Sequence, residues 1–155
     1  MNDTEPIYIN RPILNADCAA LARMARLSGD KTISPTWLHW VTGKPHTQSM
    51  LYEHEIDGVA HPIAWCLWGK EKAMRSINIG PMICHLEYDG HLLYQLMLGH
   101  IIRTTSPMYP AVLLEHVRAD NDQLTIAAQG IGFYCESSRV INGVAYLNFR
   151  FGVEV

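Results

Sequence analysis

The stretch INIGPMICHLEYDGHLLYQ, residues 77–95, decides the fold. Its apolar first part, residues 77–83, predicts a β-strand. A polar loop with one glycine, residues 85–90, leads into a predicted helix over 91–103, and a second apolar strand follows over 111–117. We expect these two strands to be parallel neighbours in one sheet, because a crossover helix is the usual connection between parallel strands.

The loop before this helix is a candidate anion site. Backbone N–H groups of a loop that opens a helix point toward the helix N-terminus, where a diphosphate could bind. The helix over 91–103 is apolar on almost all sides, which predicts extensive packing against the sheet. After the second strand, Asp120 and Asn121 offer caps for another helix, and Gly132 can end it.

The rest of the chain predicts five more strands and two more helices. Hairpin turns are expected at Asp57-Gly58 and Asn142-Gly143. Ser34 and Pro35 are suited to the cap and first position of a short helix. The additional strands are expected at 7–13, 49–56, 61–68, 134–140 and 144–153, and the additional helices at 15–27 and 35–41; the strand that begins at 77 extends over 75–84. The run over 61–68 is nearly all apolar, as expected of a central strand covered on both faces. The chain is therefore expected to be α/β, with seven strands and four helices.

Composition favours one domain over residues 1–155. Hydrophobic residues make up 48% of the chain and charged residues 17%, which is enough apolar material for a substantial core. The formal net charge is −3, and no basic block occurs, so nucleic-acid binding is not expected.

The four cysteines are far apart and favour free thiols over a disulfide framework or a zinc site. The histidines show no metal-ligand spacing, and no metal site is expected. Neither a signal peptide nor an apolar membrane span is visible, so we expect a cytoplasmic protein without a membrane partner.

The order of elements from residue 77 to Gly132-Phe133 resembles the acyl-CoA-binding half of the GNAT superfamily of N-acetyltransferases. The resemblance implies a mixed, splayed seven-stranded sheet with helices on both faces. It also implies acetyl-CoA or another acyl-CoA as co-substrate. In the family, a Gln/Arg-x-x-Gly-x-Gly/Ala loop holds the pyrophosphate of coenzyme A. Only the final glycine, Gly90, matches here, and Tyr88 replaces the first.

The resemblance therefore assigns acyl-CoA binding to the end of the strand, the loop and the following caps. These residues are Met82, Ile83, Cys84, Tyr88, Asp89, Gly90, His91, Leu92 and Asn121. Asp89 and Asn121 are also suited to purely structural helix capping. The family places a tyrosine seven residues after the asparagine as acid for the thiolate, and Ala128 occupies that position. The coenzyme A thiolate would have to leave without that acid.

Gly80-Pro81 is suited to the bulge that the family carries in its fourth strand, because proline cannot donate to a sheet ladder. In the family, the pantetheine arm lies where this strand splays from the fifth. Candidates for a general base there are Glu115 and His116 on the fifth strand, with Glu53, His54, Glu55 and His85 as further carboxylates and imidazoles. Each of these could instead be a surface or structural residue.

The sequence thus predicts an acyl-CoA-dependent N-acyltransferase acting on an amine of a small molecule or a protein. A catalytically inactive module with the same fold, binding a ligand or a partner, is the alternative. An acyltransferase that uses an acyl-carrier protein is a narrower one, and a homodimer is compatible with either.

Overall fold

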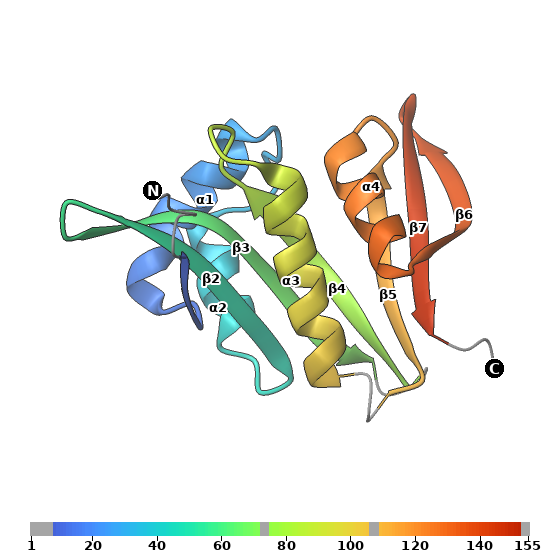
Figure 1. Ribbon diagram of the computed structural model, residues 1–155, viewed down its shortest axis with the longest axis horizontal. Helices are drawn as coiled ribbons and strands as arrows, with labels where there is room; N and C mark the ends of the chain where they lie inside the picture. Colours follow the sequence, from blue (N-terminus) through green and yellow to red (C-terminus); the bar gives the residue numbers. More distant parts are fainter. Residues whose placement is uncertain (1–7, 72–74, 106–108, 153–155) are drawn as a thin grey trace, which may run out of the picture.

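The computed structural model describes residues 8–71, 75–105 and 109–152 of the chain (Figure 1). The elements are β1 (Tyr8–Arg11), the 3-10 helix η1 (Asn15–Asp17), α1 (Cys18–Leu27), α2 (Pro35–Thr42), β2 (Thr47–Ile56), β3 (Val59–Glu71), β4 (Ser76–Cys84), α3 (Gly90–Thr105), β5 (Ala111–Arg118), α4 (Asp122–Ile131), β6 (Tyr134–Ile141) and β7 (Val144–Gly152). The predicted number of strands and α-helices is confirmed. The first predicted helix begins with the 3-10 turn, and the predicted ends at Ile7 and Val153 lie outside the described residues.

The seven strands form one mixed sheet in the order β1-β2-β3-β4-β5-β7-β6. β4 and β5 are parallel neighbours, as predicted, and the other neighbouring strands pair antiparallel. The second predicted strand–helix–strand transition, β5-α4-β6, does not give a paired parallel neighbour. β7 lies between β5 and β6, because it returns from the Asn142-Gly143 turn to pair with both.

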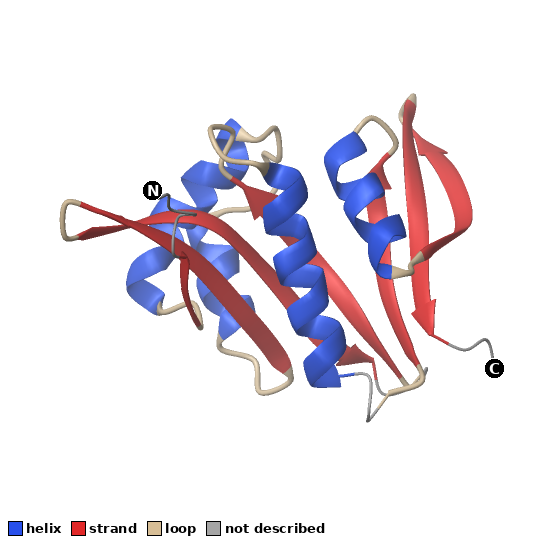
Figure 2. Ribbon diagram, in the orientation of Figure 1, coloured by secondary structure: helices blue, strands red, loops and turns tan. Residues whose placement is uncertain are grey.

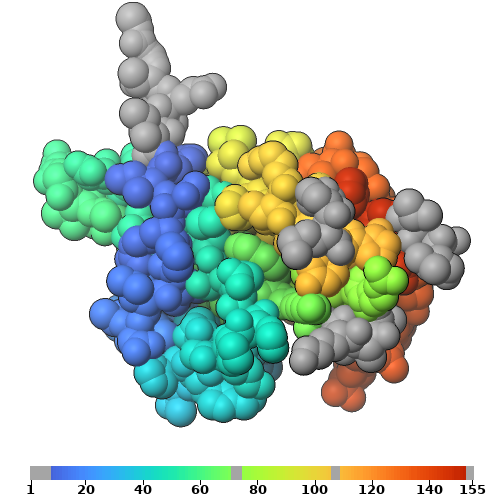
Figure 3. All heavy atoms as spheres, turned by 90° about the horizontal axis from the view of Figure 1, so that it is seen from below, coloured from blue at the N-terminus to red at the C-terminus, as the bar shows by residue number. Residues whose placement is uncertain are grey.

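The helices cover both faces of the sheet. Figures 1 and 2 show α3 and α4 in front of the strands and α1 and α2 behind them. Seen from below in Figure 3, the N-terminal half in blue and cyan and the last strands in orange and red lie on opposite sides of the molecule. This arrangement leaves α3 above the centre of the sheet, where it contacts both β3 and β4.

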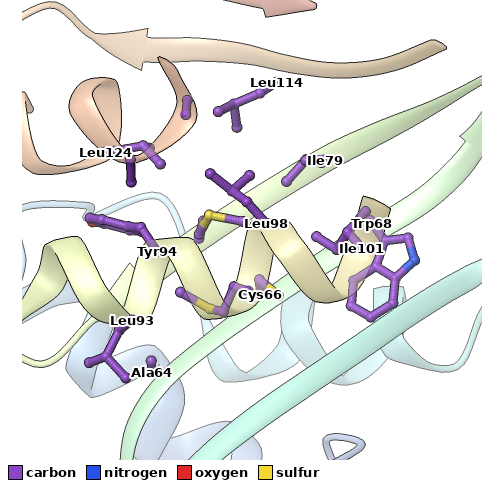
Figure 4. Packing of buried hydrophobic residues seen from close by; sticks show 14 of the residues in the cluster. Ala64, Cys66, Trp68, Ile79, Leu93, Tyr94, Leu98, Ile101, Leu114 and Leu124 are labelled. Atoms are coloured by element: carbon purple, nitrogen blue, oxygen red, sulfur yellow. The ribbon is translucent and has the colours of Figure 1, made fainter. Parts of the chain in front are cut away.

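The core divides into two clusters, one on each face. The larger cluster, between the sheet and helices α3 and α4, includes Cys66, Met97 and Leu114 (Figure 4). The smaller cluster, under α1 and α2, includes Leu21 and Trp65. Successive residues of β3, such as Trp65 and Cys66, face opposite clusters and are fully buried. This pattern confirms the prediction that residues 61–68 form a central strand covered on both sides.

A side-chain cap marks the start of α2 but not that of α1. Ser34 accepts a hydrogen bond from the N–H of Trp37 at 3.0 Å, which is the predicted cap of α2. Asp17 does not cap α1 through its side chain. Its carboxylate accepts the N–H of Leu14 at 2.7 Å and pairs with Arg11 at 2.7 Å, and so fixes the turn between β1 and α1.

Candidate functional site

The parallel pair at the centre of the sheet is short. Its ladder joins Ser76–Ile79 on β4 to Ala111–Leu114 on β5, although β4 continues to Cys84 and β5 to Arg118. Beyond Ile79 and Leu114, no further pair joins the two strands within the described residues. We call this separation of β4 from β5 the splay. It leaves the β5-facing edge of β4 free to pair with another extended chain.

A bulge lies on each strand directly after the last shared pair. Cys66 pairs with Met82 and Trp68 with Ile79, so Leu67 stands opposite both Gly80 and Pro81. The predicted Gly80-Pro81 bulge is therefore present. On β5, the register shifts between Leu114 and Val117, where Glu115 and His116 stand opposite Asn148 of β7. Because a bulge bends its strand and increases the local twist, two bulges at one level separate the strands.

The sequence analysis missed the second bulge, which determines where Glu115 and His116 lie. His116 has a positive φ of 59°, its N–H donates to Oδ1 of Asn148 at 3.0 Å, and its ring meets Tyr146 edge to face. Glu115 is exposed, and within the described residues it has no ion-pair partner. The nearby Arg118 pairs with Asp120 at 3.0 Å instead. A carboxylate that pairs with no described cation thus lies at the start of the splay.

The three base candidates on β2 belong elsewhere. Glu53 is buried and pairs with Arg11 at 2.9 Å, and Glu55 is exposed near the β2–β3 hairpin. The His54 ring lies 2.8 Å from the Tyr88 hydroxyl, measured from Nδ1. β2 is separated from β4 by β3, so none of these three side chains starts from a strand of the splay.

The loop between β4 and α3 uses many of its own N–H groups. The N–H of His85 donates to the Ile63 carbonyl at 2.7 Å, and that of Tyr88 to the His85 carbonyl at 3.1 Å. The N–H of Glu87 donates to Nδ1 of the His85 ring at 3.1 Å. A pyrophosphate loop needs such amides to point outward and unpaired. In this loop, the N–H groups of His85, Glu87 and Tyr88 already donate to protein acceptors and are not free for a pyrophosphate.

Asp89 caps α3, which is the structural role considered for it. Its Oδ1 accepts the N–H of Leu92 at 3.2 Å, and its carbonyl accepts the N–H of Leu93 at 3.1 Å. The carboxylate therefore occupies part of the helix N-terminus, where an anionic ligand would be expected to bind. Glu87 is exposed beside it.

Tyr88, which stands where the family has a glycine, is directed toward β2. Its hydroxyl meets His54, and its ring also makes edge contacts with Tyr8 and His85. These contacts of Tyr88 hold the loop against the β1–β2 side of the sheet. The Tyr88 side chain is thus placed away from β5, and its contribution to a donor site at the splay would come from its backbone.

Gly90 and Asn121 lie where the N-termini of α3 and α4 meet. Gly90 is buried, and a Cβ at this position would collide with Oε1 of Gln123, which extends from α4. Asn121 caps α4 by accepting the N–H of Leu124 at 3.2 Å. The predicted capping role of Asn121 is confirmed, and its amide nitrogen remains available to other groups.

Tyr94 lies beside these predicted residues, although the sequence analysis did not identify it. Its phenol interacts with the side chains of Asn121 and Cys84, so that α3, α4 and the end of β4 meet at this side chain. Burial raises the pKa of Tyr94 to about 12 and that of the Cys84 thiol to about 12. Both groups are protonated at neutral pH. A tyrosine four residues after Gly90, the one Phe, Tyr or Trp residue of α3, was the available signal (Figure 4).

The position where the family has a tyrosine is occupied by a buried alanine in this chain, which cannot act as an acid. Ala128 is fully buried in the larger core cluster, and its carbonyl accepts the N–H groups of Gly132 and Phe133 at the end of α4. Gly132 has φ +122°, as expected for a glycine that ends a helix. No described acid group replaces the family tyrosine at this point of α4.

The remaining predicted binding residues surround the same end of β4. The side chains of Met82 and Cys84 belong to the larger core cluster, and that of Ile83 to the smaller one. On α3, Leu92 is exposed and His91 is half-buried. Only the backbone of residues 82–84 is therefore suited to meet a ligand in the splay.

A pocket of about 300 Å³ lies at the opposite end of α3, between Trp68, Lys70, Thr105 and Tyr109. It contains none of the predicted site residues. Across the described ranges, no three His, Cys, Asp or Glu side chains come together as a metal site. No α-helix in the described part of the chain is long and apolar enough to cross a bilayer.

Comparison with known proteins supports the fold through solved structures. No protein-family model matches the chain, and neither does any curated protein. Among solved structures, Arabidopsis thaliana NAA60 in complex with acetyl-CoA is similar with a TM-score of 0.78 and 15% identity, covering 95% of this chain and 99% of that chain.

Two bacterial structures agree. A probable acetyltransferase of the GNAT family from Chromobacterium violaceum has a TM-score of 0.68 and 16% identity, over 97% of this chain and 84% of that chain. Mutant forms of the spermidine/spermine N-acetyltransferase SpeG from Vibrio cholerae have a TM-score of 0.69 and 15% identity, over 94% and 95%. With its splayed seven-stranded sheet and two helices on each face, this chain has the fold of the GNAT acetyltransferases.

Proposed function

We propose that the protein is an N-acyltransferase that moves a short acyl group, acetyl in the simplest case, from an acyl-CoA thioester to an amine. The observation that carries this proposal is the splay between two bulged strands, with the N-termini of α3 and α4 at one end and Glu115 at the other. Structures with the same fold bind acetyl-CoA or act on polyamines, and they support the same donor and acceptor classes here.

The proposed reaction is a direct transfer. The carboxylate of Glu115 takes a proton from the acceptor ammonium, directly or through one water, and the free amine attacks the thioester carbonyl carbon. A backbone N–H of β4 near Met82 polarises the carbonyl oxygen. The new C–N bond forms as the C–S bond breaks, and the products are the amide and the thiol.

The leaving thiolate takes its proton from solvent in this scheme, because Ala128 provides no acid. A thiol has an ordinary pKa near 8.5, so its anion can leave without protonation. Glu115 returns its proton to solvent after each turnover. Acyl transfer is therefore expected to proceed without the tyrosine that the family provides.

A second candidate is an inactive module with the same fold that binds an acyl-CoA or a partner. The internal hydrogen bonds of the loop over 85–90 and the buried Ala128 favour it. The two candidates differ in turnover rather than in fold.

One experiment separates them. The full-length protein is mixed with acetyl-CoA and a panel of primary amines and peptides, and release of the free thiol is followed together with the mass of each acceptor. Acetylated product formed in proportion to thiol supports the enzyme. Binding of acetyl-CoA by calorimetry without product from any acceptor in the panel supports the inactive module, and the absence of both contradicts an acyl-CoA site.

A further inference from the structure

The two ends of the proposed donor site differ in how they can bind a thioester donor. One end, at the loop and the two helix N-termini, is where a diphosphate would lie. The other, along β4 beside Tyr94, is where a pantetheine arm would lie. The inference below rests on the proposed function and concerns which part of the donor is recognised.

The diphosphate end is acidic. Glu87 and Asp89 flank the start of α3, and Asp120 and Asp122 flank the start of α4. No lysine or arginine occurs between residues 76 and 102 or between 119 and 138. Arg118 is adjacent, but it is exposed and paired with Asp120. Like charges would therefore oppose a diphosphate from both helices.

Some of the amides at this end are also engaged. The N–H groups of Glu87, Tyr88 and Leu92 already donate to His85 or Asp89. Nδ1 of His85 accepts one of these bonds, so that nitrogen presents a lone pair to the loop rather than a proton. A diphosphate could use these three amides only if their internal bonds broke, which lowers the binding capacity of this end.

The pantetheine end is neutral and polar. The Tyr94 hydroxyl interacts with the Cys84 thiol and with the side chain of Asn121. A thiol sulfur is a weak acceptor, so an amide carbonyl of a pantetheine arm is a better partner for the same hydroxyl. The β5-facing edge of β4, unpaired beyond Ile79, offers main-chain groups to the two amides of that arm.

We infer that the donor is recognised as an S-acyl-pantetheine thioester, held by Tyr94, Asn121 and the edge of β4, and that the nucleotide diphosphate of coenzyme A contributes little to its binding. The arm can come from coenzyme A or from the phosphopantetheine of a carrier protein. Both sources present the same two amides and the same thioester.

The test measures dissociation constants of the full-length protein by calorimetry for acetyl-CoA, S-acetyl-4′-phosphopantetheine, S-acetylpantetheine and an acetylated phosphopantetheine carrier protein. A loss of affinity smaller than about tenfold from acetyl-CoA to S-acetylpantetheine supports the inference, and a larger loss overturns it. Tighter binding of the carrier protein than of acetyl-phosphopantetheine identifies that source, and equal or weaker binding identifies coenzyme A. If no thioester binds at all, the proposed function fails as well, whereas tight binding of acetyl-CoA alone overturns only the inference.

Two matched pairs of variants locate the effect. Tyr94→Phe should weaken the binding of all the thioesters by a similar factor. Tyr109→Phe, at the far end of α3, should weaken the binding of none of them. Asp89→Asn keeps the helix cap and removes the charge. It should therefore raise the affinity for acetyl-CoA and acetyl-phosphopantetheine but leave the affinity for S-acetylpantetheine unchanged. Asp57→Asn, in the β2–β3 turn, controls for net charge. The assignment is contradicted if Asp89→Asn raises the affinity for all donors equally. It is also contradicted if Tyr94→Phe weakens the binding of acetyl-CoA alone.

Discussion

Gln123 on α4 covers Gly90 at the start of α3. The Oε1 atom of Gln123 lies so close to the Gly90 Cα that a Cβ at position 90 would collide with it. The contact joins the N-termini of the two helices that border the proposed donor site. The colliding atom is the far end of an exposed, flexible side chain, which makes the contact testable without disrupting the fold.

Gly90→Val should therefore destabilise the protein by about 1–3 kcal/mol through overpacking, and the added change Gln123→Ala should recover most of this loss. Urea unfolding of both single variants and the double variant measures the coupling. An equal loss of stability in Gly90→Val and in the double variant would show that Gln123 is not the obstacle.

Glu115→Gln should lower the rate of acyl transfer by about 10²–10⁴ with little change in stability, because it removes a base from an exposed position. Glu55→Gln, also exposed but near the β2–β3 hairpin, is the control and should keep the wild-type rate. The pH profile of kcat/KM should rise with pH in the wild type as the acceptor amine loses its proton. A Glu115→Gln enzyme with wild-type turnover across the pH range would return the role of base to His116 or to the free amine itself.

The network around Arg11 predicts a pH dependence of stability. Hydrogen bonding from Arg11 lowers the pKa of Asp17 below its ordinary value, and burial opposes this shift only in part. A carboxyl with a lowered folded pKa stabilises the fold above its unfolded pKa, near 3.9, and this contribution is lost as the pH falls through the folded value.

Asp17→Asn should thus cost about 1–2 kcal/mol at pH 7, since it removes the charge that pairs with Arg11. The difference from wild type should shrink as the pH falls below 4. Urea midpoints from pH 7 to pH 2.5 measure it, with Asp57→Asn as a control of equal charge change. A difference that stays constant down to pH 2.5 would contradict the ionic origin.

The thiols predict a single fast reaction with a disulfide reagent. Cys135 is exposed, whereas Cys18, Cys66 and Cys84 are buried and burial raises the pKa of each thiol. Native protein should react rapidly at one thiol near pH 8, because the thiolate is the reactive species. Cys135→Ser should abolish the fast phase, and unfolding should expose three more thiols in that variant. A fast phase that persists in Cys135→Ser would show that a core cysteine is accessible.

Much of the fold follows from local signals in the sequence. The dipeptides Asp57-Gly58 and Asn142-Gly143 adopt the positive φ angles that tight hairpins need, so both turns were predictable. The apolar run over 61–68 predicted a strand buried on both faces. The proline at position 81 predicted a break in the ladder of β4, because it has no N–H to donate. The resemblance of the element order to the GNAT superfamily then provided the topology.

The tertiary structure decided what depends on partners distant in sequence. A bulge is defined by the register against a neighbouring strand. The bulge at Glu115 and His116 could therefore not be predicted from the sequence, because it depends on Asn148 of β7, which lies opposite both residues. Likewise, the sequence analysis did not identify Tyr94, because only folding brings Cys84 and Asn121 to its hydroxyl. Periodicity and turn chemistry act within a few residues, and they fix which element each segment forms. The side chains that meet at the splay come from β4, α3 and α4, and only the packing of these elements determines that they meet.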